Sequence, residues 1–222
     1  MGSYSVSFKN YDKYAIDVQY IIMENESTLY PVILSVPEDA RLLPPRDLVV
    51  FLSLHARKAL GLSAQMSKLS MKEPLKDKDG RPLPTEGVYW SLTHKPDYVA
   101  AVVAQQPIGI DIEKIAERQT AALFGKVADT MEWALIGGKS WEGFHRYWTA
   151  KEAALKAEGT GLSALSRCRV IGIKDTVNLV IQLRNRRMDV EHHYFDNHIA
   201  SVVKTAKRVS WTLVDTHLNP GD

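Results

Sequence analysis

The chain has 222 residues, of which 45% are hydrophobic and 24% are charged, a composition typical of a soluble globular protein and not of a disordered one. The formal net charge of +2 is too small to predict a nucleic-acid-binding protein, which needs clustered Lys and Arg. The single cysteine, Cys168, excludes an internal disulfide and a cysteine-rich zinc site.

Nothing in the sequence predicts a secreted or membrane protein. The N-terminal segment lacks the apolar core of a signal peptide, and the longest apolar runs are far too short for a transmembrane helix. The low cysteine count fits a reducing cytosol. We therefore expect a cytoplasmic protein with no membrane partner and no nucleic-acid partner.

The first half of the chain predicts strands around one helix. Segments rich in β-branched and aromatic residues predict four strands, at residues 14–23, 28–36, 88–93 and 98–104. Apolar residues at three- and four-residue spacings predict a helix over residues 48–60, with Gly61 as its stop. Residues 72–87 are rich in turn-forming residues and predict a long loop.

The second half begins after Gln105-Gln106-Pro107 with a predicted strand at residues 108–113. Apolar periodicity predicts three helices, at residues 117–124, 129–136 and 141–157. Strand-like segments follow at residues 168–173, 177–183, 191–195, 199–204 and 210–214. The predicted strands and helices are grouped unevenly in each half, which favours an α+β fold with antiparallel sheets over a doubly wound parallel sheet. We expect two α+β halves, residues 1–106 and 107–222, and a site between them would draw residues from both.

The strand predicted at residues 108–113 carries two carboxylates on one face. Strand alternation places Asp111 and Glu113 on one side and Ile110 and Ile112 on the other. Adjacent carboxylates repel each other, so they are tolerated in water or shared by a hard cation such as Mg²⁺. A solvated strand end is the plainer alternative, and the pair alone does not decide between the two.

The helix predicted at residues 141–157 carries an aromatic residue, a carboxylate and an ammonium group along one stripe. Trp148, Glu152 and Lys156 follow one another at intervals of four residues. Taken alone, they are explained by a Glu152–Lys156 surface pair and a core tryptophan. Together with the acidic strand, Glu152 is a candidate oxygen ligand or general base, and Lys156 is a candidate phosphate contact.

Two loops offer further candidates for anion binding. Thr93 and His94 end a predicted strand, where a hydroxyl and an imidazole can donate to a phosphate. Arg81 lies in the turn Asp79-Gly80-Arg81-Pro82, and its guanidinium matches the geometry of a phosphate. An ordinary loop histidine and a solvent-exposed arginine remain the alternatives for these positions.

Four motifs occur in a characteristic order: Gly80-Arg81-Pro82, then Ser91-Leu92-Thr93-His94, then Gly109-Ile110-Asp111-Ile112-Glu113, then the helical segment at residues 148–156. In this order they resemble the 4′-phosphopantetheinyl transferases, which move the phosphopantetheine arm of coenzyme A onto a serine of a carrier protein. The resemblance covers residues 80–162, and the length is that of the larger, Sfp-type branch. It implies a monomer that is a pseudo-dimer of two similar halves, each a small antiparallel sheet packed with helices, with the active site between the halves.

The resemblance also implies roles for these residues. Asp111, Glu113 and Glu152 are expected to hold Mg²⁺, for which Mn²⁺ can substitute, and Asp111, Glu152 and Lys156 to be catalytic. Coenzyme A is the expected co-substrate, and its phosphates and nucleotide are expected to be bound by Arg57, Arg81, Thr93, His94 and Lys156. The nucleophile would be a serine of an apo acyl or peptidyl carrier protein, and the released product adenosine 3′,5′-bisphosphate. A nucleophile on the partner explains why the chain has no nucleophile motif of its own.

Two positions depart from the family pattern. Thr93 stands where the family usually has Ser, which keeps the hydroxyl. Ser53 stands where many relatives carry Arg, one helical turn before Arg57, so the residue that binds the adenylate end of coenzyme A is left open among Arg46, Arg57 and Lys58.

Several alternatives remain open from the sequence. A Mg²⁺-dependent phosphohydrolase of coenzyme A or nucleotides would use the same carboxylates with water as nucleophile. A non-catalytic module that binds coenzyme A or a carrier is a second alternative. Glu152 is either a metal ligand alone or also the base. Fatty-acid, polyketide and nonribosomal-peptide carriers are all candidates, and residues 125–139 are predicted either to dock the carrier or to be a packed connecting helix.

Overall fold

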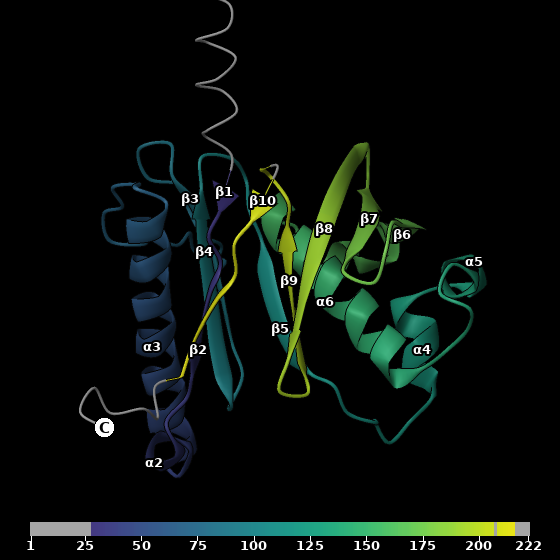
Figure 1. Cartoon of the computed structure of the whole chain (residues 1–222), viewed down its shortest axis with the longest axis horizontal. Coiled ribbons are helices and arrows are strands. Elements are labelled where there is room, and N and C mark those ends of the chain that lie inside the picture. The colour runs from purple at the N-terminus through teal and green to yellow at the C-terminus, as the bar shows by residue number, and fades with distance from the viewer. Residues whose placement is uncertain (1–27, 207, 216–222) are drawn as a thin grey trace, which may run out of the picture.

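The computed structural model describes residues 28–206 and 208–215, which form a mixed α+β fold built on two larger sheets (Figure 1). The predicted α+β class is confirmed. The strand predicted at residues 14–23 lies outside the described residues. The strand predicted at residues 28–36 is divided, because β1 (Thr28–Leu29) pairs with β10 (Arg208–Val209) and β2 (Val32–Ser35) belongs to another sheet.

The N-terminal sheet has the strand order β11-β2-β4-β3. Its remaining strands β3, β4 and β11 span Tyr89–His94, Tyr98–Ala104 and Thr212–Val214. The predicted strand pair is confirmed, since β3 and β4 are antiparallel neighbours. β11 runs parallel to β2, so the prediction of a purely antiparallel N-terminal sheet is wrong. The division at residue 106 stays a prediction, although β11 lies in space with the N-terminal sheet.

Helix α3 (Pro45–Met66) covers one face of the N-terminal sheet. Proline suits its first position because the missing N–H would have no helical partner there. Ala56 and Ala59 are fully buried, and their small side chains let the helix approach the sheet closely. The predicted stop at Gly61 is wrong, because the helix continues for another turn and the burial of Ala64 outweighs the low helix propensity of glycine.

A short helix precedes α3, and a long loop follows it. The helix is α2 (Glu38–Arg41). The loop predicted at residues 72–87 is confirmed, because strand pairing there is limited to two isolated bridges, Lys76 with Pro82 and Thr85 with Val88.

Five antiparallel strands form the C-terminal sheet, in the order β5-β9-β8-β7-β6. Strands β5 to β9 span Ile110–Lys114, Cys168–Ile173, Asn178–Leu183, Arg186–Phe195 and His198–Val203. All five were predicted, but β8 begins five residues before its expected start at residue 191. The antiparallel character predicted for this half is confirmed.

Helix α6 (Trp141–Glu158) lies along the C-terminal sheet and confirms the longest predicted helix. Ser140 caps its start, because Ser140 Oγ accepts a hydrogen bond from the backbone N–H of Gly143 at 3.0 Å. Gly159 ends the helix with a φ of 65°, a left-handed conformation that glycine adopts without strain. Both boundaries therefore follow from local chemistry.

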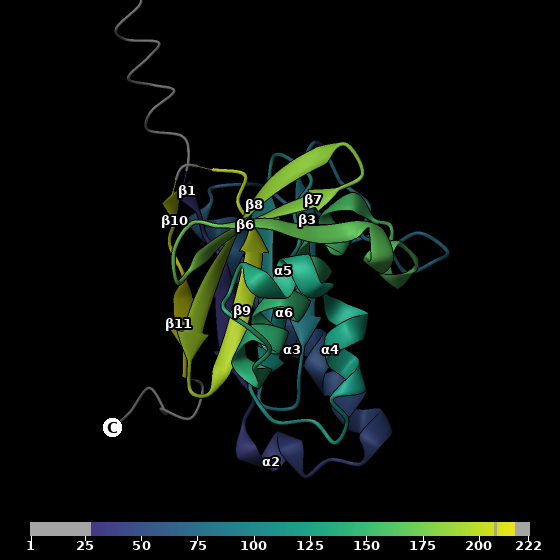
Figure 2. The ribbon, with the colours of Figure 1, turned by 90° about the vertical axis from the view of Figure 1, so that its right-hand side faces the viewer.

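Three short helical pieces surround α6. Helices α4 (Ala122–Val127) and α5 (Thr130–Ala134) lie on the same side of β9 as α6 does (Figure 2), and the 3-10 helix at Leu162–Arg167 follows it. α4 begins later than the helix predicted at residues 117–124, and α5 lies within the one predicted at residues 129–136. Among the described residues, no helix has both the length and the apolar character needed to cross a membrane.

We predict that Gly109→Ala strongly destabilises the protein. A Cβ at this position would lie 1.9 Å from the carbonyl oxygen of Ala153 and 2.7 Å from the nitrogen of Ala157, so β5 and α6 would have to separate. Overpacking of this kind is expected to lower the free energy of unfolding by about 3 kcal/mol or more, as measured by urea denaturation.

Gly61→Ala is the matched control. No atom lies within 4 Å of a Cβ at this exposed helical position, so the variant should gain about 0.5–1 kcal/mol from the better helix propensity of alanine. Equal unfolding free energies for the two variants would contradict the close approach of β5 and α6.

Candidate active site

The two larger sheets meet where β3 faces the free edge of β5. The backbone N–H of Ile110 donates to Ser91 Oγ at 3.2 Å, and the carbonyl oxygen of Ile110 accepts from Lys156 Nζ at 3.0 Å. β5 is an edge strand, so β9 cannot reach these backbone groups, and side chains from β3 and α6 satisfy them instead. Three elements are thereby drawn together around β5.

Asp111 is the carboxylate at the centre of this meeting point. Its side chain is buried, and Oδ1 accepts from Thr93 Oγ1 at 2.9 Å and from Lys156 Nζ at 2.8 Å. Oδ2 is also buried and has no hydrogen-bond partner among the described residues. A buried charged oxygen without a partner is unfavourable, so Oδ2 is suited to receive a ligand.

Glu113 is held by side chains from two other elements. Its Oε1 accepts from Lys95 Nζ at 2.7 Å and from Trp148 Nε1 at 3.1 Å. Arg118 Nη2 lies 3.8 Å from Oε2. As strand alternation predicts, Glu113 opens on the same pocket as Asp111. The contacts tie the β3–β4 turn and α6 to the end of β5.

Glu152 projects from α6 toward the same place. Its carboxylate forms neither a hydrogen bond nor an ion pair with another residue of the described ranges. Burial, and then the negative charge of Asp111, raises the pKa of the Glu152 carboxyl above its usual range. A carboxylate with a raised pKa accepts a proton more readily than an exposed one, and a bound cation would offset the same unfavourable charge.

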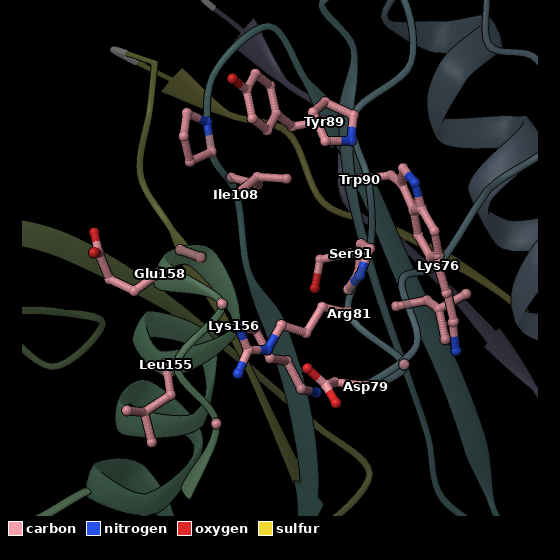
Figure 3. A pocket seen from close by; sticks show the side chains of 18 of the residues that line it. Lys76, Asp79, Arg81, Tyr89, Trp90, Ser91, Ile108, Leu155, Lys156 and Glu158 are labelled. Atoms are coloured by element: carbon pink, nitrogen blue, oxygen red, sulfur yellow. The ribbon is translucent and has the colours of Figure 1, made fainter. Parts of the chain in front are cut away.

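Two adjoining pockets, which share lining residues, form a crevice beside these residues. Its first part, the carboxylate pocket, has a volume of about 370 Å³ and is lined by the three carboxylates with Thr93, His94, Lys95 and Trp148. Its second part, the Arg81 pocket, has a volume of about 530 Å³, and Arg81, Tyr89, Trp90, Ile108 and Leu155 are among its walls. Four residues line both parts: Lys76, Leu92, Glu152 and Lys156. In Figure 3, Arg81 reaches across toward Lys156 on α6.

The crevice has a positive character alongside its carboxylates. Partial burial, followed by the charges of Lys156, Lys95 and Lys76, lowers the pKa of His94. His94 is therefore neutral at physiological pH and can still donate one ring N–H.

The structure brings most of the predicted site residues together. Asp111, Glu113, Glu152, Lys156, Thr93 and His94 line the carboxylate pocket, and Arg81 lines the adjoining one. Arg57 is not part of this group: it is exposed on α3 and lines neither pocket. Lys58 lines a separate pocket between α3 and β11.

The sequence reasoning did not single out two lysines that the structure places in the crevice. Lys95 directly follows His94 and pairs with Glu113. Its position next to the Thr93-His94 motif in the sequence could have indicated that it lies at the site. Lys76 comes from the loop before β3, and no spacing in the sequence indicated that it would reach the site.

Lys151 belongs to the helical motif but serves the fold. It is buried, and its Nζ donates to Glu132 Oε1 and to the carbonyl oxygen of Val127, both at 2.6 Å. Glu132 Oε1 also accepts from the backbone N–H of Val170. The pair fastens α5 to α6 and keeps the face of α6 that carries Glu152 turned toward the crevice.

The donor set of the carboxylate pocket fits a hard cation only after a rearrangement. Among residues 28–206 and 208–215, no three His, Cys, Asp or Glu side chains lie close enough together to form a metal site. Lys156 and Lys95 hold Asp111 and Glu113 in ion pairs. Three carboxylates on one pocket, with Asp111 Oδ2 and Glu152 lacking partners in the described chain, are nevertheless the ligand type that Mg²⁺ prefers. The fit therefore requires the two ammonium groups to move aside, and the metal assignment stays a prediction.

Comparison with known proteins gives the same family as the motifs. Residues 107–211 match the family model described as the 4′-phosphopantetheinyl transferase superfamily. A Haemophilus influenzae protein, provisionally named a 4′-phosphopantetheinyl transferase, is 31% identical over 91 residues, which cover 38% of this chain and 39% of the relative. The 4′-phosphopantetheinyl transferase gsp of Aneurinibacillus migulanus is 27% identical over 95 residues, which cover 39% of this chain and 38% of the relative.

These matches are partial. The chain spans about two fifths of the length of these curated relatives. The matched region contains β5 with Asp111 and Glu113 and α6 with Glu152 and Lys156. Residues 107–211 are therefore similar to the 4′-phosphopantetheinyl transferase superfamily, which confirms the resemblance that the motifs indicated.

Proposed function

We propose that the protein is a Mg²⁺-dependent 4′-phosphopantetheinyl transferase of the larger, Sfp-type branch. It transfers the phosphopantetheine arm of coenzyme A to a serine of an apo acyl or peptidyl carrier protein and releases adenosine 3′,5′-bisphosphate. The observation that carries the proposal is the crevice in which Asp111, Glu152 and Lys156 meet beside Arg81. A pocket of this size suits a ligand as large as a nucleotide.

Cationic and hydrogen-bonding groups of the crevice bind the phosphates of coenzyme A. Arg81 offers a planar guanidinium, which pairs with phosphate oxygens through two parallel hydrogen bonds. Lys156 adds a second cation, and Thr93 and His94 add a hydroxyl and an imidazole N–H. The apolar side chains of Tyr89, Ile108 and Leu155 would face the less polar parts of the ligand.

The transfer step needs a proton acceptor and a group that stabilises the leaving oxygen. The carrier serine oxygen attacks the β-phosphorus, and the bond from that phosphorus to the bridging oxygen breaks. The bridging oxygen leaves with the electron pair as part of adenosine 3′,5′-bisphosphate. Glu152, whose pKa is raised, is suited to accept the serine proton, and Lys156 is placed to stabilise charge on the leaving oxygen.

Three carboxylates would hold the metal ion: Asp111, Glu113 and Glu152. Bound Mg²⁺, or Mn²⁺ in its place, would offset the negative charge that collects on the phosphate oxygens. Lys156 and Lys95 neutralise Asp111 and Glu113 in the structure described, so the binding of Mg²⁺ and coenzyme A would free both ammonium groups for phosphate oxygens.

The architecture supports a pseudo-dimer with the active site between its halves. Each larger sheet carries one long helix, α3 on the N-terminal sheet and α6 on the C-terminal sheet. The crevice takes Thr93 and Arg81 from one half and Asp111 and Glu152 from the other. We propose that the protein acts as a monomer in the cytoplasm.

The carrier protein would dock on residues 125–139. Met131 on α5 is 74% exposed, Leu135 directly after this helix is 44% exposed, and Lys126 and Lys139 are also exposed. Fatty-acid, polyketide and nonribosomal-peptide carriers are all candidates, because each presents a serine to the same reaction.

The reaction class is tested by intact mass spectrometry of an apo carrier protein incubated with the enzyme, coenzyme A and Mg²⁺. We expect a mass gain equal to one phosphopantetheine arm, with adenosine 3′,5′-bisphosphate in the supernatant. Hydrolysed coenzyme A and an unmodified carrier would indicate a phosphohydrolase instead. Binding of coenzyme A without turnover, across several carrier types, would indicate a non-catalytic module.

Removing either central carboxylate should stop the transfer. Asp111→Asn and Glu152→Gln are each expected to lower the transfer rate by about 100-fold or more, because charge stabilisation or proton acceptance is lost. Glu142→Gln is the matched control, since Glu142 is exposed on the same helix and lines neither part of the crevice. A folded Asp111→Asn enzyme with near wild-type turnover would remove Asp111 from the catalytic group.

Metal removal is the third test of this proposal. Excess EDTA should abolish the transfer, and added Mg²⁺ or Mn²⁺ should restore it, since the carboxylate pocket offers three carboxylates as oxygen ligands. Binding of Mn²⁺, followed by electron paramagnetic resonance, should weaken in Glu152→Gln. Undiminished transfer in EDTA would contradict the metal assignment.

A further inference from the structure

Helix α3 lacks a positively charged residue that many relatives carry for binding the ligand. Ser53 stands at the position of the expected arginine on α3, and Arg57 lines neither part of the crevice. Helix α3 therefore brings no cationic side chain to the crevice. The cations that line the crevice come from other elements, among them the loop before β3.

The loop before β3 presents a cation at this place. Residues 75–83 form a small hairpin, in which Leu83 N donates to the Leu75 carbonyl and Asp77 N to the Arg81 carbonyl, both at 2.9 Å. Asp77 Oδ1 closes the turn by accepting from the backbone N–H groups of Asp79 at 2.8 Å and Arg81 at 2.9 Å. These bonds hold the hairpin in one shape, and the bridge between Lys76 and Pro82 places Lys76 across from the residue that follows Arg81.

Lys76 stands at the junction of the crevice. It lines both the carboxylate pocket and the Arg81 pocket, as Glu152 and Lys156 also do. Figure 3 shows Lys76 on the β3 side of the pocket and Lys156 on the α6 side. A ligand that occupies both parts of the crevice would therefore lie near both ammonium groups.

The charge of Lys76 is also uncompensated. Lys95 and Lys156 are engaged by Glu113 and Asp111. Lys76 forms no ion pair with any residue in the described part of the chain. Its ammonium group is therefore available to an anion without first breaking a contact.

We propose that Lys76 binds the pyrophosphate of coenzyme A. The assignment rests on the proposed function, which puts the reacting phosphorus beside Asp111, Glu152 and Lys156. The pyrophosphate carries that phosphorus, whereas the 3′-phosphate lies at the far side of the ribose. Because Lys76 shares both pockets with Glu152 and Lys156, it lies beside the reacting end of the ligand.

Calorimetric titration of the full chain with coenzyme A and with 3′-dephospho-coenzyme A, in the presence of Mg²⁺, tests this assignment. Lys76→Ala should weaken the binding of both ligands by the same factor, about 10-fold or more, because both contain the pyrophosphate. Lys76→Arg should retain most of the affinity, since it keeps the positive charge. Lys78→Ala is the matched control: Lys78 is exposed in the same hairpin and lines neither part of the crevice.

Each contrary outcome overturns a different statement. Binding by Lys76→Ala that equals binding by Lys78→Ala would overturn the role of Lys76 and leave the proposed function intact. A loss seen with coenzyme A but absent with 3′-dephospho-coenzyme A would assign Lys76 to the 3′-phosphate instead. A wild-type protein that binds neither ligand would overturn the proposed function, and this assignment with it. Thermal unfolding of each variant confirms that the hairpin change leaves the fold intact.

Discussion

The close approach of β5 to α6 determines where the parts of the crevice lie. Glycine at position 109 lets the strand pass against the helix backbone at a distance that any Cβ would prevent. Lys156 then reaches both the Ile110 carbonyl and Asp111 from the last turn of the helix. Without this approach, the helix that carries Glu152 would stand away from the strand that carries the other two carboxylates.

A second, fully buried chain of hydrogen bonds fixes the position of α6 along the C-terminal sheet. Ser201 Oγ donates to Thr149 Oγ1 at 2.7 Å, and Thr149 Oγ1 donates to the His145 carbonyl at 2.8 Å. Because the Ser201 hydroxyl is used as a donor, His192 Nδ1 is the donor in the 2.8 Å contact between them. Burial lowers the pKa of His192 to about 3, so this ring stays neutral.

The strand register of the β5–β9 pair links this series of hydrogen bonds to the site. Ser201 is the direct partner of Asp111 in the β5–β9 pair, and Thr149 precedes Glu152 by three residues on α6. The same contacts that satisfy buried hydroxyl groups therefore also set how far Glu152 stands from Asp111.

The sequence predicted the elements whose pattern is local. α6 was predicted because its apolar periodicity lies within one segment, and the observed caps Ser140 and Gly159 are equally local. The acidic face of β5 followed from strand alternation alone. Pairings between distant segments left no such pattern, and the parallel pairing of β11 with β2 joins segments about 180 residues apart. The place of Arg57 outside the crevice and that of Lys76 inside it have a related cause, because the sequence did not show which side of α3 faces the sheet, or how far the loop before β3 reaches.

The late position of β11 in the chain has a consequence for folding during synthesis. β2, α3, β3 and β4 are made early, and they can form local contacts as soon as they emerge from the ribosome. The outer edge of β2 stays without its neighbour until residues 212–214 have been made, after the whole C-terminal sheet. Until then, the growing chain exposes an unpaired strand edge, the kind of surface that favours mispairing and chaperone binding.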